Sequence, residues 1–261
     1  MNISWVVVAV FGLLLSGCAN IQTAPTQEER QALAPTGKLR AALITTNPIH
    51  ATKDPTSGEL KGVAIDLGRE LARRIGVPFE VVSYASTGAL VASTKSGQWD
   101  IVFIGFPAAR DMDLSAPYAH IEMGYLVPKG SSISMISEID RPGLRIAVQE
   151  KGAADVLLTP TIKGATLVRR STIAGGVEML RSGTADALAG VKTYLIPASE
   201  KLPGSRVLEG RIAVEGVGIG VPKGHELSAA YVRKFVEEAK SGGFVKTAIE
   251  RAGVRGLDAA P

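Results

Sequence analysis

Hydrophobic and polar residues follow two spacings along this chain, and together they predict alternating helices and strands. Apolar residues recur every fourth position at Val63, Leu67, Leu71 and Ile75, which predicts a helix with one buried face. Short apolar runs bounded by turn residues predict buried strands. In the first half these strands lie at 38–45, 79–84, 101–104 and 123–127, with a second helix at 87–96. This βαβ order predicts an α/β fold, with a mostly parallel sheet and helices on both faces.

The same order of elements begins again after residue 130. Strands are predicted at 144–148, 166–169, 185–189, 206–208 and 217–221, and helices at 151–158, 173–181, 194–200, 225–241 and 244–252. The two halves are only loosely similar in order, and no repeat of fixed period is present. The chain is therefore expected to form two α/β lobes.

The tetrapeptide Val-Pro-Lys-Gly occurs twice, at 127–130 and at 221–224, each time after an apolar strand. We interpret the first copy as the point where the chain leaves one lobe and the second as its return. Two antiparallel crossings would then form a hinge, although Pro-Lys-Gly is also ordinary turn chemistry. The predicted division is 37–127 for the first part of lobe 1, 128–216 for lobe 2, and 217–261 for the return to lobe 1 with C-terminal helices.

The N-terminal residues predict export. Residues 1–17 carry no charged side chain, and their apolar core is too short to span a bilayer comfortably, as in a signal peptide. The sequence LLSGC at 14–18 resembles a bacterial lipobox, which implies cleavage before Cys18 and a lipid on that residue. A plain signal peptide with an unrelated Cys is the alternative. Residues 18–36, which are mostly polar, are expected to form a flexible tether. The expected location is the periplasm or the cell surface, with the lipid in the membrane.

Composition excludes several classes of protein. The chain has 261 residues, 46% of them hydrophobic and 21% charged, which is typical of a globular domain. Aromatic residues make up only 5%, and the net charge of +4 comes from scattered residues, so nucleic-acid binding is not expected. The sole Cys and three distant His residues form no metal motif. No nucleophile elbow, dinucleotide loop or P-loop is present, so we expect neither cofactor nor catalysis.

Several short segments together resemble one family. They are GKLR at 37–40, GELKGVAIDL at 58–67, GQWD at 97–100, SAPY at 115–118, PGLRIAVQEKG at 142–152 and LRSGTADA at 180–187. In this order and spacing, the chain from about 37 to 253 is similar to the family 3, or amino-acid-type, solute-binding proteins of bacterial ABC importers. The resemblance implies a two-lobed periplasmic binding protein fold of type II that closes on a small-molecule ligand without changing it. It also implies a monomer that delivers the ligand to an ABC permease in the inner membrane.

The resemblance also implies ligand-binding residues. An Arg in this region holds the ligand's α-carboxylate in the family, which suggests Arg110, because a guanidinium fork matches a carboxylate. The interval from Arg110 to Ser115 is shorter than is usual in the family, so the loop must be rebuilt. Gly152, Ala153 and Ala154 begin a helix and offer backbone N–H groups to an anion. The alternatives are a surface Arg and an ordinary strand–helix turn.

One expected acid is missing. In amino-acid binders of the family, the strand that begins near Asp186 usually ends in an Asp that pairs with the ligand ammonium, but this chain has Val191 there. Two interpretations stay open: the ligand lacks an α-amino group, or Glu122 or Glu215, both near a predicted crossing, serves instead. We hypothesise a small carboxylate or a modified amino acid rather than a standard one.

Asn47, Phe106, Tyr118 and Tyr194 are further candidates to line the site. The expected function is capture of an amino acid, an amino-acid derivative or an organic acid between the lobes, which shifts an open–closed equilibrium. Two alternatives share the fold: a periplasmic dehydratase acting on a cyclic carboxylic acid, and a ligand receptor that feeds a membrane sensor.

Overall fold

The computed structural model describes residues 24–45, 49–54 and 56–261. The predicted signal peptide, Cys18 and Asn47 lie outside the described residues. Within those ranges, no helix has both the length and the apolar character needed to cross a bilayer.

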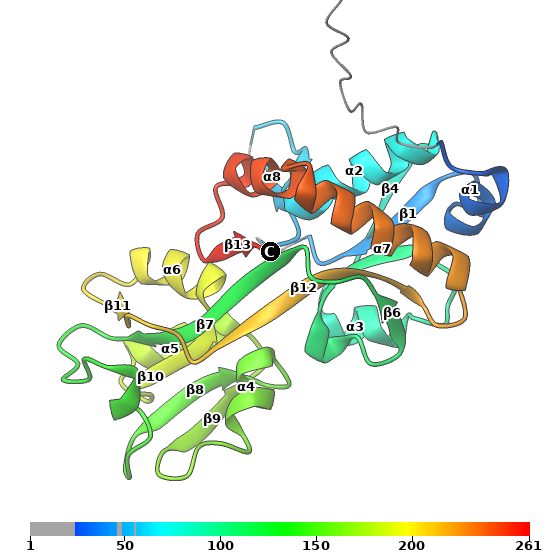
Figure 1. The fold of residues 1–261 in the computed structure, drawn as a ribbon. Helices are drawn as coiled ribbons and strands as arrows, with labels where there is room; N and C mark the ends of the chain where they lie inside the picture. The colour runs from blue at the N-terminus through cyan, green and yellow to red at the C-terminus, as the bar shows by residue number, and fades with distance from the viewer. Residues whose placement is uncertain (1–23, 46–48, 55) are drawn as a thin grey trace, which may run out of the picture.

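A continuous 11-stranded sheet runs through both lobes (Figure 1). In spatial order its main strands are β4 (Phe79–Ser83), β1 (Leu39–Leu43), β5 (Ile101–Gly105), β12 (Ala213–Pro222), β7 (Ala119–Val127), β10 (Ala187–Val191), β8 (Arg145–Gln149) and β9 (Thr166–Arg170). β1 pairs in parallel with β4 and β5 in lobe 1, and β8 pairs in parallel with β10 and β9 in lobe 2. The predicted α/β fold with one parallel set of strands in each lobe is therefore confirmed.

Shorter strands complete the sheet. β6 (Met112–Leu114) pairs with β12, while β11 (Arg206–Val207) and β13 (Leu257–Ala259) pair with β7. β2 (Thr52–Lys53) and β3 (Leu60–Lys61) form a separate hairpin. Two 3-10 turns, η1 (Phe106–Ala108) and η2 (Ile136–Glu138), follow β5 and β7.

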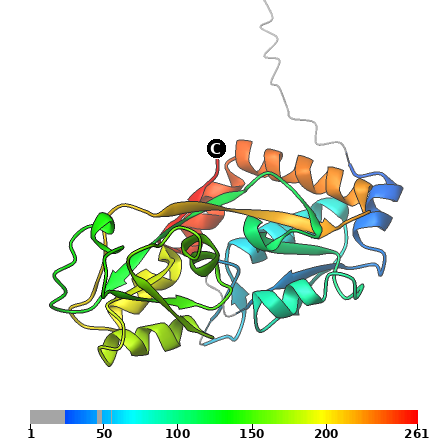
Figure 2. The ribbon, with the colours of Figure 1, turned by 90° about the horizontal axis from the view of Figure 1, so that it is seen from below.

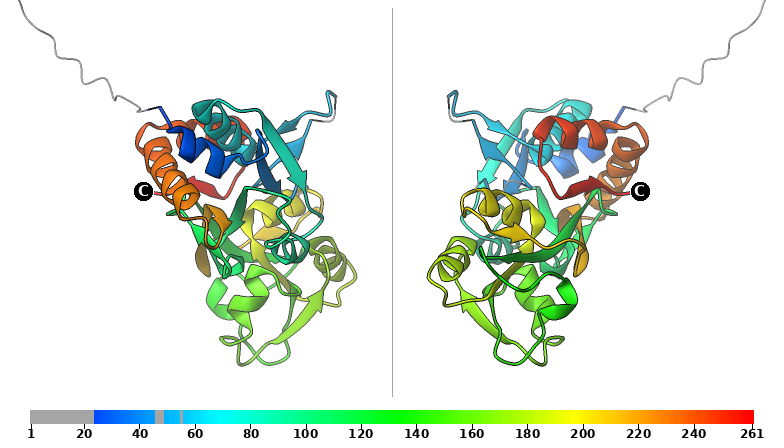
Figure 3. Two further views of the ribbon diagram at one scale, coloured as in Figure 1. Left: turned by 90° about the vertical axis from the view of Figure 1, so that its right-hand side faces the viewer. Right: turned by 90° about the vertical axis from the view of Figure 1, so that its left-hand side faces the viewer.

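Helices cover both faces of the sheet in each lobe (Figure 3). In lobe 1, α2 (Val63–Ile75), α7 (Glu226–Ser241) and α8 (Phe244–Ala252) share one core, and α3 (Thr87–Ala92) packs on the other face. The apolar residues of α2 at every fourth position are all buried, and Gly76 ends the helix in the left-handed conformation. In lobe 2, α4 (Ala153–Leu158) lies on one face, and α5 (Ile173–Arg181) and α6 (Lys192–Glu200) on the other.

Two long antiparallel strands, β7 and β12, join the lobes (Figure 2). β7 pairs with β13 up to Ile121 and with β10 from Met123, so the change of lobe falls inside the strand. The two antiparallel crossings are as expected, but their position is not. Each of the two strands is long enough to run through both lobes. The two Val-Pro-Lys-Gly copies lie at the far ends of these strands, away from the change of lobe, and they only terminate the strands.

Residues 24–36 are not a uniform tether. Helix α1 (Gln27–Leu33) begins with a capping box: the Thr26 hydroxyl accepts from the Glu29 N–H, and the Glu29 carboxylate accepts from the Thr26 N–H. Leu33 is only 1% exposed and belongs to the lobe 1 core, with α1 lying against α7. The expected flexible segment is therefore wrong for residues 27–34, because a short apolar end on a polar segment is enough to dock it.

Candidate functional site

The carboxyl ends of both parallel strand sets face the crossing between the lobes. β5 ends at Gly105, which lies opposite Val217 of β12. β10 ends at Val191, opposite Met123 of β7, and Met123 in turn pairs with Ala213. Positions 213 and 217 are four residues apart on one strand, about 13 Å. Because open α/β sheets bind ligands at the carboxyl ends of their strands, the candidate site lies between these two ends.

Glu215 lies midway between the two strand ends. Side chains alternate across a strand, so Glu215 shares a face of the sheet with Val217 and with its partner Ile121. Its carboxylate lies on Gly105, where a Cβ would overlap it. Burial raises the pKa of Glu215 from its usual value to about 7. Within the part of the chain that the structure describes, this carboxylate makes no hydrogen bond and no ion pair.

Val191 lies on the same face as Glu215, because it pairs with Met123, two residues along β7 from Ile121. Its side chain packs against the cores of both lobes. At position 191, where the family resemblance implied an acid, both the side chain and its neighbours are therefore apolar.

Glu122 has a different environment from the one predicted. It alternates with Ile121 and so points to the opposite face of β7 from Glu215. Lys192 Nζ lies 2.7 Å and Arg211 Nη1 2.8 Å from its carboxylate oxygens. These hydrogen bonds, that of Lys192 first, lower the pKa of Glu122. Glu122 therefore links β7 to α6 and to the chain before β12, and its role as a ligand-binding acid stays a prediction.

Arg110 lies far from the crossing. After Gly105 the chain passes through η1 and begins β6 at Met112, which pairs with Pro222. Pro222 is five residues from Val217, the partner of Gly105, so the chain travels about 17 Å away from the site. Arg110 is exposed at that distal end. The shortened loop joins Arg110 to the start of β6, and its role in holding a solute stays a prediction.

Two aromatic candidates also point elsewhere. Tyr118 is fully buried, with its ring edge-on to Phe103 at 6.0 Å and 76°. Its hydroxyl has no partner among the described residues, and burial raises its pKa. Phe106 is 38% exposed, but its ring covers Gly218 on the face of β12 opposite to Glu215. Tyr118 is thus a core residue, and Phe106 covers the face of β12 opposite to Glu215; that either lines the site stays a prediction.

The Asp155 carboxylate lies at the start of α4. Gly152 donates its N–H to the Gln149 carbonyl at 3.0 Å. The Asp155 carboxylate accepts from the Lys151 N–H at 2.9 Å and forms an ion pair with Arg169 at 2.9 Å. The Ala153 and Ala154 side chains pack on the lobe 2 core, Ala154 being buried. Asp155 thus takes the Lys151 N–H and the Gln149 carbonyl takes that of Gly152, while anion binding by Ala153 and Ala154 stays a prediction.

The site-facing edge of lobe 2 is basic. Four basic residues lie at the ends of its strands or soon after them: Lys151, Arg169, Arg170 and Lys192. The acids at this edge are Glu150 and Asp155. Arg169 and Lys192 are paired with acids, whereas Arg170 donates to the Arg169 carbonyl and to no carboxylate among the described residues. The sequence analysis did not select Arg170, although two consecutive arginines at the end of a predicted strand could have indicated it.

The facing edge of lobe 1 carries hydroxyl groups. Thr45 Oγ1 and Ser83 Oγ, just after β1 and at the end of β4, lie 2.7 Å apart. In lobe 2, Tyr194 lies in the first turn of α6 and is partly buried, and burial raises its pKa to about 12. The site thus combines a basic edge, a hydroxyl-bearing edge and one unpaired acid. No group of metal-ligating side chains occurs in the described ranges.

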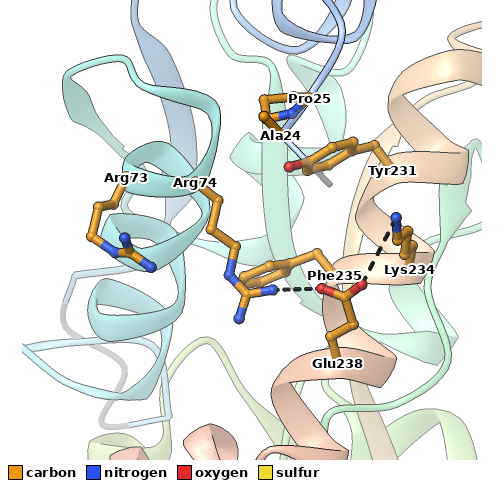
Figure 4. Close-up of a pocket in the computed structure, with 8 residues that line it drawn as sticks. All are labelled: Ala24, Pro25, Arg73, Arg74, Tyr231, Lys234, Phe235 and Glu238. Atoms are coloured by element: carbon orange, nitrogen blue, oxygen red, sulfur yellow. Dashed lines mark hydrogen bonds and ion pairs between the residues drawn. The ribbon is translucent and has the colours of Figure 1, made fainter. Parts of the chain in front are cut away.

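Two recesses in lobe 1 lie away from this site. The smaller, of about 150 Å³, lies between α2, α7 and residues 24–25, where the Arg74 guanidinium stacks on Phe235 at 4.9 Å and pairs with Glu238 (Figure 4). The larger, of about 710 Å³, surrounds the Arg40–Asp100 ion pair near the starts of β1 and β5. Both belong to the side of lobe 1 remote from the strand ends that face the crossing.

Comparison with known sequences identifies relatives among transport proteins. The ABC transporter glutamine-binding protein GlnH of Bacillus subtilis is 21% identical over 218 residues, which cover 81% of this chain and 80% of the relative. The glutamine-binding protein of Geobacillus stearothermophilus is also 21% identical, over 242 residues covering 84% and 92%.

Solved structures share the fold. A solute receptor for L-cysteine from Neisseria gonorrhoeae has a TM-score of 0.74 at 21% identity, covering 88% of this chain and 99% of the receptor. A mutant of ArgBP from T. maritima has a TM-score of 0.71 at 23% sequence identity, covering 86% of this chain and 99% of the mutant. An ancestral amino acid-binding protein, a precursor of cyclohexadienyl dehydratase, has a TM-score of 0.71 at 23% sequence identity. The match covers 85% of this chain and 98% of the ancestral protein. Residues 39–252 match the bacterial extracellular solute-binding proteins of family 3, and the chain belongs to that family.

Proposed function

We propose that this protein captures a small carboxylate-bearing solute between its lobes and delivers it to an ABC importer without changing it chemically. The observation that carries the proposal is the register of the crossing: β5 and β10, from different lobes, both end at β7 and β12, at levels four residues apart along β12. The basic edge of lobe 2 supports an anionic group on the solute. An amino acid, an amino-acid derivative or an organic acid would fit this description.

The mechanism is closure around two strands. A solute that contacts both lobes binds the closed form better than the open form and shifts the population towards it. Among the described residues, β7 and β12 join the main strands of the two lobes, so a small change of backbone angles there can reorient one lobe. The carboxylate would face Arg170 and its neighbours. The closed form would dock on a permease in the inner membrane, with the predicted lipid on Cys18 keeping the protein near it.

A thermal-shift screen tests the binding step. The purified exported protein is heated with amino acids, organic acids and amines, one at a time. A solute present at 100 times its Kd stabilises the protein by about 2.7 kcal/mol, which raises the melting temperature visibly. If no carboxylate-bearing compound shifts the melting temperature, the proposal is wrong. Uptake of the hit compound in cells lacking the gene then tests delivery.

One observation favours a second candidate, a dehydratase of the same fold. A partly buried carboxyl whose pKa is about 7 suits a general acid or base at neutral pH, and Glu215 has this property. The test is loss of water from a cyclic carboxylic acid on incubation with the protein, with Glu215→Gln as the inactive control. Turnover abolished by that substitution would replace the binding proposal.

A further inference from the structure

The larger recess of lobe 1 has the size of a small-molecule pocket and is separate from the site between the lobes. Its volume is about 710 Å³, and pockets that hold small ligands typically occupy about 300–1,000 Å³. Three connections that are distant in sequence meet around it: those between α1 and β1, between α3 and β5, and between β12 and α7. A solute held at the crossing would therefore leave this recess open to another ligand.

Helix α7 begins at this recess. His225, which lines the recess, precedes the helix and does not cap it with its side chain. The N–H groups of Glu226, Leu227 and Ser228 make no hydrogen bond within the part of the chain that the structure describes. Free N–H groups and the helix dipole favour an anion at a helix N-terminus. The helix start alone does not define a ligand, but it sets the sign of the charge that would be stabilised there.

Ser228 adds a buried hydroxyl that has no partner. It lines the recess from the first turn of α7, it is only 3% exposed, and its Oγ makes no hydrogen bond with any described residue. Serine has one side-chain torsion, so this hydroxyl can turn to a ligand at little cost. Thr94, the other buried hydroxyl on the wall, donates to the Val91 carbonyl at 2.7 Å. The unpaired Ser228 hydroxyl therefore indicates a partner that enters the recess from outside the chain.

The unpaired charges on the wall are mostly positive. Lys95, after α3, and Lys223, after β12, form no ion pair with the described residues. The Arg40 guanidinium and the Asp100 carboxylate satisfy each other through two hydrogen bonds, of 2.7 and 3.0 Å. Asp111 is the acid on this wall that has no cation partner in the described ranges. Two free ammonium groups against one free carboxylate favour an anionic ligand.

We propose that this recess binds a small phosphomonoester, with its phosphate at the first turn of α7 near Ser228, Lys223 and Lys95. A phosphate ester carries a charge of about −1.5 to −2 at neutral pH and three acceptor oxygens, which suit a hydroxyl, a backbone N–H and an ammonium group together. The volume exceeds what a bare ion needs, and apolar side chains complete the wall: Ala32, Pro35, Trp99 and Pro222. These side chains would contact the carbon part of the ester.

The test measures ligand binding to the purified exported protein by calorimetry at constant ionic strength. The probes are phenyl phosphate, inorganic phosphate, which lacks the ring, and benzoate, which replaces the phosphate with a carboxylate. Phenyl phosphate should bind more tightly than either of the others. Binding of inorganic phosphate alone overturns the assignment to an ester. Benzoate that binds equally well, with the same dependence on Ser228, overturns the choice of phosphate over carboxylate. No binding of phenyl phosphate removes the proposal.

Ser228→Ala and Lys223→Gln should each weaken phenyl phosphate binding about tenfold, because each removes a hydrogen bond to a charged group. The hydroxyl that Ser228→Ala removes has no partner, so this variant should be at least as stable as wild type in urea and its weaker binding would not reflect misfolding. Lys246→Gln makes the same charge change as Lys223→Gln on an exposed residue of α8, beyond the far end of α7, about 24 Å from its first turn. It should bind like wild type.

Equal affinity of wild type and Ser228→Ala for phenyl phosphate overturns the proposal. Equal weakening by Lys223→Gln and Lys246→Gln also overturns it, since it indicates attraction by net charge alone. Asp111→Asn removes an acid from the wall and should tighten binding; weaker binding contradicts the placement of the phosphate. Affinity for the solute found by thermal shift should stay within twofold in all these variants, so the phosphate site and the proposed function stand or fall separately.

Discussion

The carboxylate of Glu215 lies on the α-carbon of Gly105, in the space that a side chain at position 105 would need. One residue comes from the strand that ends at the site and the other from a strand that crosses between the lobes. Their contact couples the end of the lobe 1 sheet to the crossing.

Gly105→Ala should therefore destabilise the protein by only about 1 kcal/mol, because the new methyl group pushes aside the end of a flexible side chain. Removing that carboxylate makes room, so Glu215→Ala in the same chain should recover most of the loss. Urea unfolding of the two single variants and the double variant measures this coupling. Additive changes in the free energy of unfolding would show that the side chains at positions 105 and 215 do not interact.

Glu215 should also make stability depend on pH. Its pKa is raised from 4.5 to about 7, so the folded state holds a proton that the unfolded state releases between these values. This contribution is present below about pH 4.5 and is lost as pH rises through 7, a change on the order of 2–3 kcal/mol. Urea unfolding without solute should show wild type losing stability relative to Glu215→Gln between pH 5 and pH 8. A constant difference would contradict the assignment.

Two arginines should behave differently. Arg110→Ala removes an exposed cation at the distal end of lobe 1 and should leave solute affinity within twofold. Arg170→Ala removes a cation from the site-facing edge of lobe 2 and should weaken binding of a carboxylate about threefold to tenfold, because hydrogen bonds from charged groups typically contribute 1.5–3 kcal/mol and exposure reduces this. Calorimetry with the solute found by thermal shift compares them. A large effect of Arg110→Ala alone would restore the prediction from sequence.

The N-terminal helix should be part of the folded unit. Leu33 is 1% exposed in the lobe 1 core, so Leu33→Ala should cost about 2–4 kcal/mol. A chain that begins at Gly37 lacks the whole helix and should melt at a lower temperature than one that begins at Ala24. Equal melting temperatures would mean that α1 is dispensable.

Tyr118→Phe should be neutral or slightly stabilising. The Tyr118 hydroxyl is buried without a partner among the described residues, so removing it relieves an unmet hydrogen bond and leaves the ring contact with Phe103 in place. Thermal unfolding and solute binding should both match wild type. Loss of binding would place Tyr118 back in the site.

Regular elements were predictable where packing follows the spacing of apolar residues. The bounds of α2, α5 and α8 agree with the predicted ranges 63–75, 173–181 and 244–252, because each has a continuous apolar stripe. Helix α1 was missed because only its last turn is apolar. The position of the crossings was missed because a strand that serves two lobes has the same composition on both sides of the change.

The site was harder to predict for a geometric reason. Sequence spacing placed Glu122 and Glu215 near the crossing, but only the strand register shows that their side chains lie on opposite faces of the sheet. Arg110 was assigned by resemblance, and a shorter loop carried it to another part of lobe 1. Arg170 needed the lobe 2 topology, since β9 is neighbour to β8 and not to the crossing strands.

Both described ends of the chain lie in lobe 1, at α1 and β13, while lobe 2 enters and leaves through the middle of β7 and β12 (Figure 1). Lobe 2 is thus an uninterrupted insertion in the sequence of its partner. A single exchange of coding sequence between the two crossings would replace the whole of lobe 2 and leave the N-terminal helix and lobe 1 unchanged. This arrangement lets solute preference diverge by recombination as well as by point substitution.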